Sequence, residues 1–105
     1  MILEASWIDA EKIDVGNDTV KLSASKISNP KMQYVVLSVE TNDIRLGTQR
    51  GVDAITSAGT EAGSVKFTDG ATVKITNYND IKELKMIAET VDSAAVVHVN
   101  YYGSL

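Results

Sequence analysis

The sequence contains no cysteine and a single histidine. Without cysteine, the chain has neither disulfide bonds nor thiolate ligands for a metal ion. Clustered basic residues are also lacking: ten lysine and arginine residues are scattered among fourteen acidic ones, for a formal net charge of −4. Nucleic-acid binding needs clustered positive charge, so this composition argues against a nucleic-acid partner.

Long apolar runs are missing as well. The longest, YVVL and AAVV, fall far short of the roughly 20 residues that a membrane-spanning helix requires. The segment MILEASWIDAEKID carries acidic residues early and no basic start, which is not the pattern of a secretory signal. We therefore expect a protein that is made and used in a soluble state, with no membrane partner.

The composition that is present, 44% apolar and 23% charged residues, is ordinary for a globular protein. A chain of 105 residues is expected to form one domain. A domain of this size buries roughly 60 to 70% of its unfolded surface, which is enough for one core with little margin. Self-association would add useful stability.

Alternation of apolar and polar side chains marks a series of short strands. The predicted strands cover residues 20–25, 34–40, 44–46, 65–67, 73–75, 84–88 and 97–102. Between Asn79 and Thr90 a helical period competes with this alternation, and we expect one helical turn at Asp80–Glu83 before the strand. The turns that separate the strands are rich in glycine and asparagine.

Two pairs of these strands are expected to form hairpins. Asp69-Gly70 is the strongest hairpin signal, because a type I′ turn needs positive φ at both central positions. In the C-terminal stretch Leu84–Tyr102, two strands are joined by a tight connection at Thr90–Ser93. A hairpin alone is not stable, so the remaining strands must cover its apolar face.

This pattern predicts an all-β fold: an antiparallel β-sandwich or jelly roll of about seven to eight strands, with at most a short helical turn. The residues expected to fill its core are Leu37, Val39, Leu46, Phe67, Ile75, Val97 and Val99.

The N-terminal segment allows two interpretations. Ser6 followed by Asp9 could open a short helix that carries Trp7, Ile8 and Ile13. The same residues could form an extended arm or an edge segment. We favour the second interpretation, with an arm or edge segment over residues 1–19 and the β-sandwich domain over residues 20–105.

Residues that could carry chemistry are few. His98 lies in the middle of a strand, and we interpret it as a histidine of the surface or of an interface. The acids Asp9, Glu11, Asp14 and Asp18 do not follow the spacing of a calcium loop and are interpreted as solvated carboxylates. We predict no catalytic residue, no metal site and no cofactor.

Apolar residues on the outward positions of the strands are more informative. If Val35, Leu37 and Val39 point inward, then Tyr34 and Val36 point outward. Neighbouring outward apolar residues indicate a surface that is covered, either by another subunit or by a second sheet of the same chain. The candidate interface residues are Trp7, Ile8, Tyr34, Val36, Ile87, Val96 and Tyr102.

From Tyr34 onward, about two thirds of the chain, the sequence contains in order DIRLGT, AITSAGTEAG, SVKFTDGATVKI, NDIKELKMIAE and the ending AAVVHVNYYG. In these segments and in the order of its elements, the chain resembles small structural proteins of tailed bacteriophages, the capsid decoration (cement or head auxiliary) proteins and related virion proteins with a β-sandwich.

The resemblance implies a non-enzymatic subunit of the virion that is made in the bacterial cytoplasm. Such a subunit associates with itself as a trimer and stabilises the capsid by binding the major capsid protein. A phage tail, collar or host-recognition module that binds a glycan through the loop Gly47–Gly63 is the alternative. A small lectin-like or enzymatic domain is a third possibility.

Overall fold

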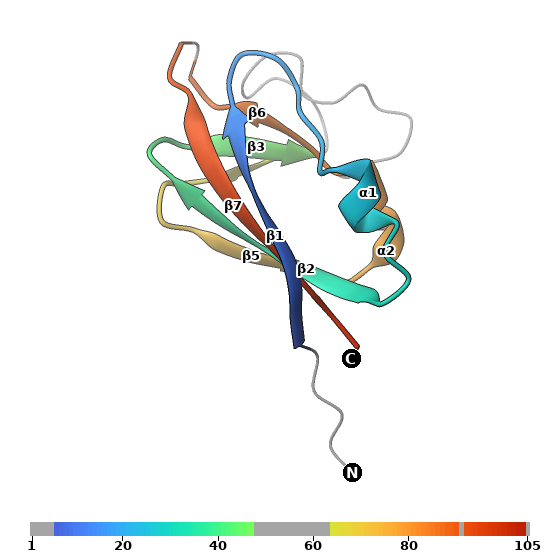
Figure 1. The fold of residues 1–105 in the computed structure, drawn as a ribbon. Helices are drawn as coiled ribbons and strands as arrows, with labels where there is room; N and C mark the ends of the chain where they lie inside the picture. Colours follow the sequence, from blue (N-terminus) through green and yellow to red (C-terminus); the bar gives the residue numbers. More distant parts are fainter. Residues whose placement is uncertain (1–5, 48–63, 91, 105) are drawn as a thin grey trace.

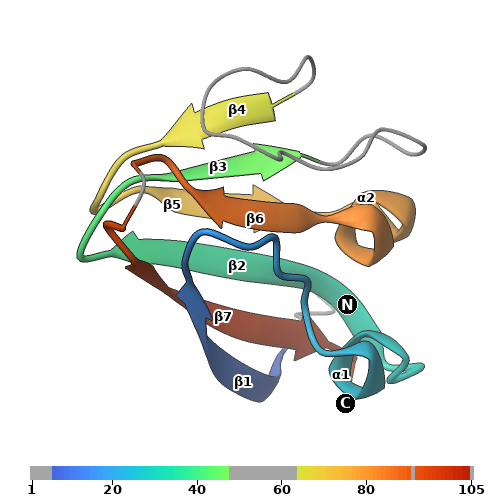
Figure 2. The same ribbon diagram turned by 90° about the horizontal axis from the view of Figure 1, so that it is seen from above.

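The computed structural model describes residues 6–47, 64–90 and 92–104, which form two antiparallel sheets packed face to face (Figures 1 and 2). In chain order, the elements are β1 (Ser6–Val15), α1 (Ala24–Ile27), β2 (Met32–Glu40), β3 (Ile44–Gly47), β4 (Ser64–Phe67), β5 (Thr72–Ile75), α2 (Tyr78–Glu83), β6 (Lys85–Ala88) and β7 (Ala95–Gly103). The predicted all-β sandwich is confirmed. Neither described helix is long and apolar enough to cross a membrane.

The strand β7 lies in the interior of the larger sheet. The four-stranded sheet has the order β1-β7-β2-β5, and the three-stranded sheet has the order β4-β3-β6. Alternate residues of β7, from Ala95 to Gly103, are buried between the sheets. They pack with inward residues of β2, such as Leu37, and of the opposite sheet, such as Ile44 and Met86. One continuous core therefore joins the two layers.

The hairpin predicted at Asp69-Gly70 does not form, because β4 and β5 belong to different sheets. Only Gly70 has a positive φ in this turn, at 92°, whereas a type I′ turn needs two such residues. The backbone of Val39 on β2 instead donates to Ala71 O at 2.9 Å and accepts from Gly70 N at 2.8 Å. The turn at Asp69-Gly70 is therefore hydrogen bonded to β2, and the chain passes through it from one sheet to the other.

The predicted C-terminal hairpin does not form either, because its two strands lie in different sheets. The turn is tight, with Ser93 N donating to Thr90 O at 3.1 Å, but β6 and β7 lie in different sheets. Both edges of β7 are occupied by β1 and β2, and β6 pairs with β3 on one side. On its other side, Met86 of β6 forms a two-way backbone bridge with Val20 at 2.9 Å.

The strand predicted over residues 20–25 is also wrong. Val20 forms only that isolated bridge, and the chain then enters α1, where the amides of Lys26 and Ile27 donate to Ser23 O at 3.1 Å. Leu22 and Ile27 are both buried in the core. The predicted strand was thus replaced by a single bridge and one helical turn, which also bury apolar residues in the core.

Two other local predictions agree with the structure. Residues 6–15 form an extended edge strand that pairs with β7 from Ser6↔Gly103 to Val15↔Ala95, so no helix forms there. The helical turn expected before the last strands is α2, followed directly by β6. Its N-cap is Asn77, whose side chain accepts from Asn79 N at 2.9 Å.

Most of the predicted core is buried, but Phe67 and Ile75 are only partly so. Both lie at the side of the sandwich where β4 and β5 are adjacent without pairing. A hollow of about 290 Å³ opens there, lined by these two residues and by Val65 and Val73. Their side chains therefore keep contact with solvent on one side.

We expect Leu37→Ala to lower the free energy of unfolding by about 2 to 5 kcal/mol, because it leaves a cavity in the closed part of the core. Phe67→Ala should cost less, since the Phe67 side chain already borders the open hollow. Urea denaturation of the two variants measures both values. A larger loss for Phe67→Ala would show that the β4 side of the sandwich is closed.

Candidate interaction surface

Five of the predicted interface residues share the outer face of the four-stranded sheet, the face turned away from the core. They are Trp7 on β1, Tyr34 and Val36 on β2, and Val96 and Tyr102 on β7. The residues that alternate with them on β2 and β7 are buried. The strand period therefore fixes this set on one surface, called here the outer face.

An aromatic row crosses the outer face perpendicular to the strands. Tyr102 is paired directly with Trp7 on one side and with Tyr34 on the other. The two tyrosine rings stack with centroids 4.9 Å apart and planes 9° from parallel. On the side of β5, Lys74 Nζ lies 4.4 Å from the centre of the Tyr34 ring. The four residues thus lie in a row that crosses all four strands, with side-chain contacts from Tyr102 through Tyr34 to Lys74.

Trp7 is the most exposed aromatic residue of this row, with 59% of its surface accessible. Its indole Nε1 donates to Asn100 Oδ1 at 3.0 Å, which orients the ring on the face of the sheet. A large, oriented and exposed tryptophan is the kind of residue that dominates the binding energy of protein interfaces.

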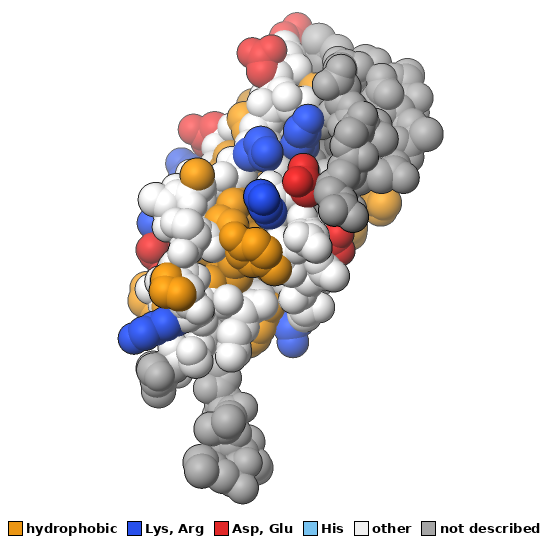
Figure 3. Space-filling model, turned by 90° about the vertical axis from the view of Figure 1, so that its right-hand side faces the viewer, with side chains coloured by type: hydrophobic (Ala, Val, Ile, Leu, Met, Phe, Trp, Pro, Cys, Tyr) orange, Lys and Arg blue, Asp and Glu red, His pale blue; other side chains and the backbone are white. Residues whose placement is uncertain are grey.

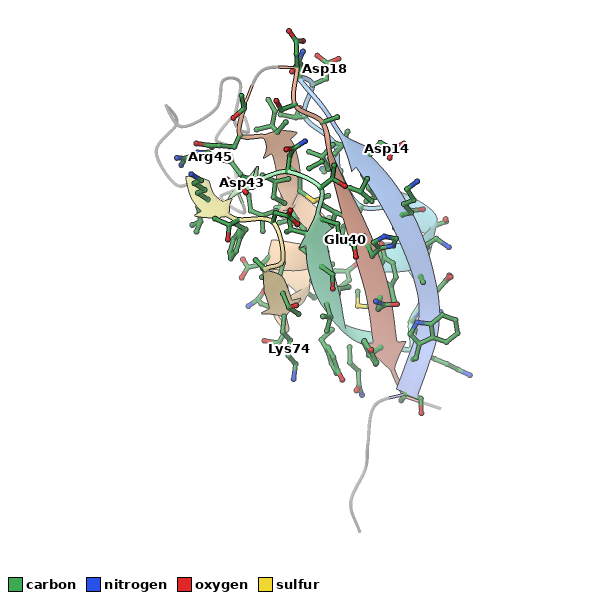
Figure 4. The ribbon with its side chains drawn as sticks, turned by 90° about the vertical axis from the view of Figure 1, so that its left-hand side faces the viewer. Asp14, Asp18, Glu40, Asp43, Arg45 and Lys74 are labelled. Atoms are coloured by element: carbon green, nitrogen blue, oxygen red, sulfur yellow. The ribbon has the colours of Figure 1, made fainter. Side chains whose placement is uncertain are left out.

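The opposite end of the outer face is charged. Val96 is paired with Asp14 on β1 and with Glu40 on β2, so it lies between two carboxylates. His98 Nε2 lies 3.0 Å from Glu40 Oε2. Figure 4 shows Asp14 and Glu40 toward one end of the sheet and Lys74 toward the other. The face thus has an aromatic half and a polar half.

The other two predicted interface residues are not on this face. Ile8 is partly buried against the core. Ile87 lies on β6 in the three-stranded sheet, and only 3% of its surface is exposed. Its cross-strand partner Arg45 forms an ion pair with Glu89, with 2.5 Å between Nε and Oε2. Ile87 is therefore wrong as a candidate for contact with another subunit: its side is already covered within the chain, and the strand period gives the direction of a side chain but not whether that side is covered.

The acidic residues considered for chemistry have separate structural positions. Asp9 Oδ1 lies 3.0 Å from Lys26 Nζ, and this hydrogen bond, helped by the amide of Ala10, lowers the pKa of Asp9. Asp14 and Asp18 are exposed. Over residues 6–47, 64–90 and 92–104 there is no group of three or more His, Cys, Asp or Glu side chains that could hold a metal ion.

Glu11 is different, and sequence reasoning missed its role. The hydroxyl of the buried Tyr101 donates a hydrogen bond to Glu11 Oε2, which also accepts from Ser23 N at 3.2 Å. Burial, together with the nearby Glu11 carboxylate, raises the pKa of Tyr101 well above its usual value. The sequence did indicate this position, because Glu11 alternates in step with Ile13 and Val15 and so points to the same side of the strand. This contact joins β1, which carries Trp7, to the core.

A scan against protein families and a search of curated proteins found no match for this chain. The similarity to phage decoration proteins accordingly stays a prediction from the sequence, and function has to be argued from the surface itself.

Tyr101→Phe should lower the free energy of unfolding by about 1 to 3 kcal/mol, because it removes the donor to a partly buried carboxylate. Tyr102→Phe is the matched control, since it removes a hydroxyl from the outer face and should change stability by less than about 0.5 kcal/mol. Urea denaturation at neutral pH measures both. Equal losses would mean that the Tyr101–Glu11 hydrogen bond contributes nothing.

The raised pKa of Tyr101 also predicts a pH dependence. The unfolded chain loses this proton near the ordinary value of 10.0, whereas the folded chain keeps it. The free energy of unfolding should therefore fall as pH rises through this value. Denaturation at about pH 9 and about pH 11 should show a smaller fall for Tyr101→Phe than for the wild type. The same slope in both proteins would contradict the assignment.

Proposed function

We propose that this chain is a non-enzymatic structural subunit of a tailed-phage virion, a capsid decoration protein that associates with itself and binds neighbouring coat subunits. The observation that carries the proposal is the aromatic row of Trp7, Tyr102, Tyr34 and Lys74 on the outer face. The virion and the coat partner are supplied by the resemblance of the sequence from Tyr34 onward.

The chemistry of the outer face suits a protein partner. Tryptophan and tyrosine are enriched at the centre of protein interfaces, and the charged residues Asp14, Glu40 and Lys12 lie toward one end, where a polar rim is expected. Tyr34 and Tyr102 each cover one face of the other's ring, so the stack presents ring edges and hydroxyls to a partner. Association would bury apolar surface that a monomer leaves partly exposed.

The size of the outer face sets a limit on the strength of association. With strands about 4.8 Å apart and about 3.3 Å per residue, the face covers on the order of 500 Å². Burying it against an equal area of a neighbour removes about 1,000 Å² in total, which is the lower end for a stable interface. Contacts with further coat subunits would then add to an association that is weak between free subunits.

The geometry of association distinguishes two arrangements. The resemblance implies a trimer, in which each outer face contacts a different surface of the next subunit. In a two-fold dimer, two outer faces would meet, and an antiparallel arrangement would bring Lys74 of one subunit near Glu40 of the other. The trimer is the arrangement that we propose.

A glycan-binding module is supported less well. The loop expected to bind the glycan, Gly47–Gly63, lies outside the described residues except for Gly47. On the outer face, a sugar ring would need an open aromatic face for stacking. Tyr102 and Lys74 occupy the Tyr34 ring, so the exposed Trp7 is the ring of this face that a sugar could stack on.

Replacing Trp7 and Val96 together by aspartate should prevent assembly and leave the subunit folded. Trp7 is largely exposed, so its replacement costs the monomer little, whereas a buried unpaired carboxylate is costly in an interface. Val65→Asp is the matched control, because Val65 is 54% exposed and lies on β4 in the other sheet. Sedimentation velocity over a range of concentrations, with circular dichroism to monitor folding, compares the three proteins.

The single tryptophan gives an independent measurement. If the outer face is buried on assembly, the fluorescence emission of Trp7 should shift to shorter wavelength as wild-type concentration rises. A wild type that stays monomeric at every concentration would contradict self-association. A double variant that assembles like the wild type would place the interface elsewhere.

A further inference from the structure

A second surface feature lies between the two helices, in a different part of the fold from the outer face. A hollow of about 400 Å³, open to solvent on one side, separates the segment that leads into α1 from α2. Leu22 and Ile27 form its buried floor, and the exposed ring of Tyr78 contributes to its wall. Figure 3 shows apolar side chains gathered in the middle of this side of the molecule.

The rim of the hollow is positively charged. Lys21 and Lys82 line it, and no acidic side chain belongs to its lining among the residues that the structure describes. Neither lysine forms an ion pair or a hydrogen bond through its side chain within that part of the chain.

We propose that this hollow is a docking site for an acidic segment of another protein, with one or two large apolar side chains inserted and carboxylates placed beside Lys21 and Lys82. The apolar floor supplies the burial, and the two ammonium groups supply charge complementarity. The site does not depend on the outer face, so it can be present whether or not the subunits associate.

The open shape of the hollow favours a protein segment over a small amphiphile. A site for a small molecule usually encloses 70 to 90% or more of the ligand. Here the floor is the surface of the core itself, so a bound fatty acid would leave much of its chain in water. A protein segment is better suited, because it can add contacts on the surrounding surface of α1 and α2.

The probe for the test is an acetylated hexapeptide in which leucine and phenylalanine alternate with glutamate. Two control peptides replace either the glutamates by lysine or the two apolar residues by serine. In ¹H–¹⁵N correlation spectra of the full chain, the acidic apolar peptide should shift the amide signals of Leu22, Ile27, Tyr78 and Lys82 in a saturable way. Each control peptide should bind at least about tenfold more weakly, as expected from the loss of a charge-assisted contact or of apolar burial.

Variants of the protein test the same site. Lys21→Gln with Lys82→Gln should weaken binding of the acidic peptide about tenfold or more, which corresponds to losing two charge-assisted contacts. Lys12→Gln with Lys66→Gln removes the same charge from the two sheets and should change the affinity less than about twofold. All four lysines are exposed, so both variants should give the dispersed spectrum of the folded protein.

Five outcomes would overturn the proposal. The acidic peptide produces no shifts at millimolar concentration, or its shifts map to another part of the chain. The control peptide with lysine in place of glutamate binds as tightly as the acidic peptide, or the two double variants of the protein weaken binding of the acidic peptide to the same extent. If dodecanoate saturates the hollow while every peptide fails to bind, the site takes a small amphiphile and not a protein segment. None of these results bears on assembly through Trp7, which the sedimentation experiment tests separately.

Discussion

Burial of the inner side of β7 against the three-stranded sheet is the interaction on which the rest of the structure depends. The strand pairs along its length with β1 on one side and β2 on the other, so its inner residues Val97, Val99 and Tyr101 lie in the middle of the core. The short connections between β2 and β3, β4 and β5, and β6 and β7 all cross from one sheet to the other. Each sheet therefore contains strands that are not consecutive in the chain, and the core between the sheets holds the two together.

The same alternation that fills the core also builds the outer face. Each residue of β7 that turns inward leaves its neighbours to turn outward, and the pairing register then sets Tyr102 between Trp7 and Tyr34. The buried hydrogen bond from Tyr101 to Glu11 holds β1 in this register at a point between Trp7 and the end of the strand. Core and candidate interface are thus two sides of one sheet, and a change in register would disrupt both.

The outer face and the hollow between α1 and α2 are formed by different elements. The first combines stacked aromatic rings with charges of both signs, and the second combines an apolar floor with two lysines on its rim. Figures 3 and 4 view the molecule from opposite sides. A subunit with two separate surfaces can contact a second copy of itself and an unrelated protein at the same time, which is the arrangement that a protein linking subunits of a larger assembly needs.

Sequence alone determined the features that depend on local periodicity: the all-β class, the inward residues of β2 and β7, the helical turn before β6, and the outward direction of Tyr34, Val36 and Tyr102. The same periodicity places Glu11 on the inward side of its strand with Ile13. Tertiary structure decided which strands pair, since hydrogen bonds to distant β2 and to Val20 outweighed the local turn signals at Asp69-Gly70 and Thr90–Ser93. It also decided that Ile87 is covered while Trp7 is exposed, because whether a side chain meets solvent depends on what packs over it, and strand period carries no information about that.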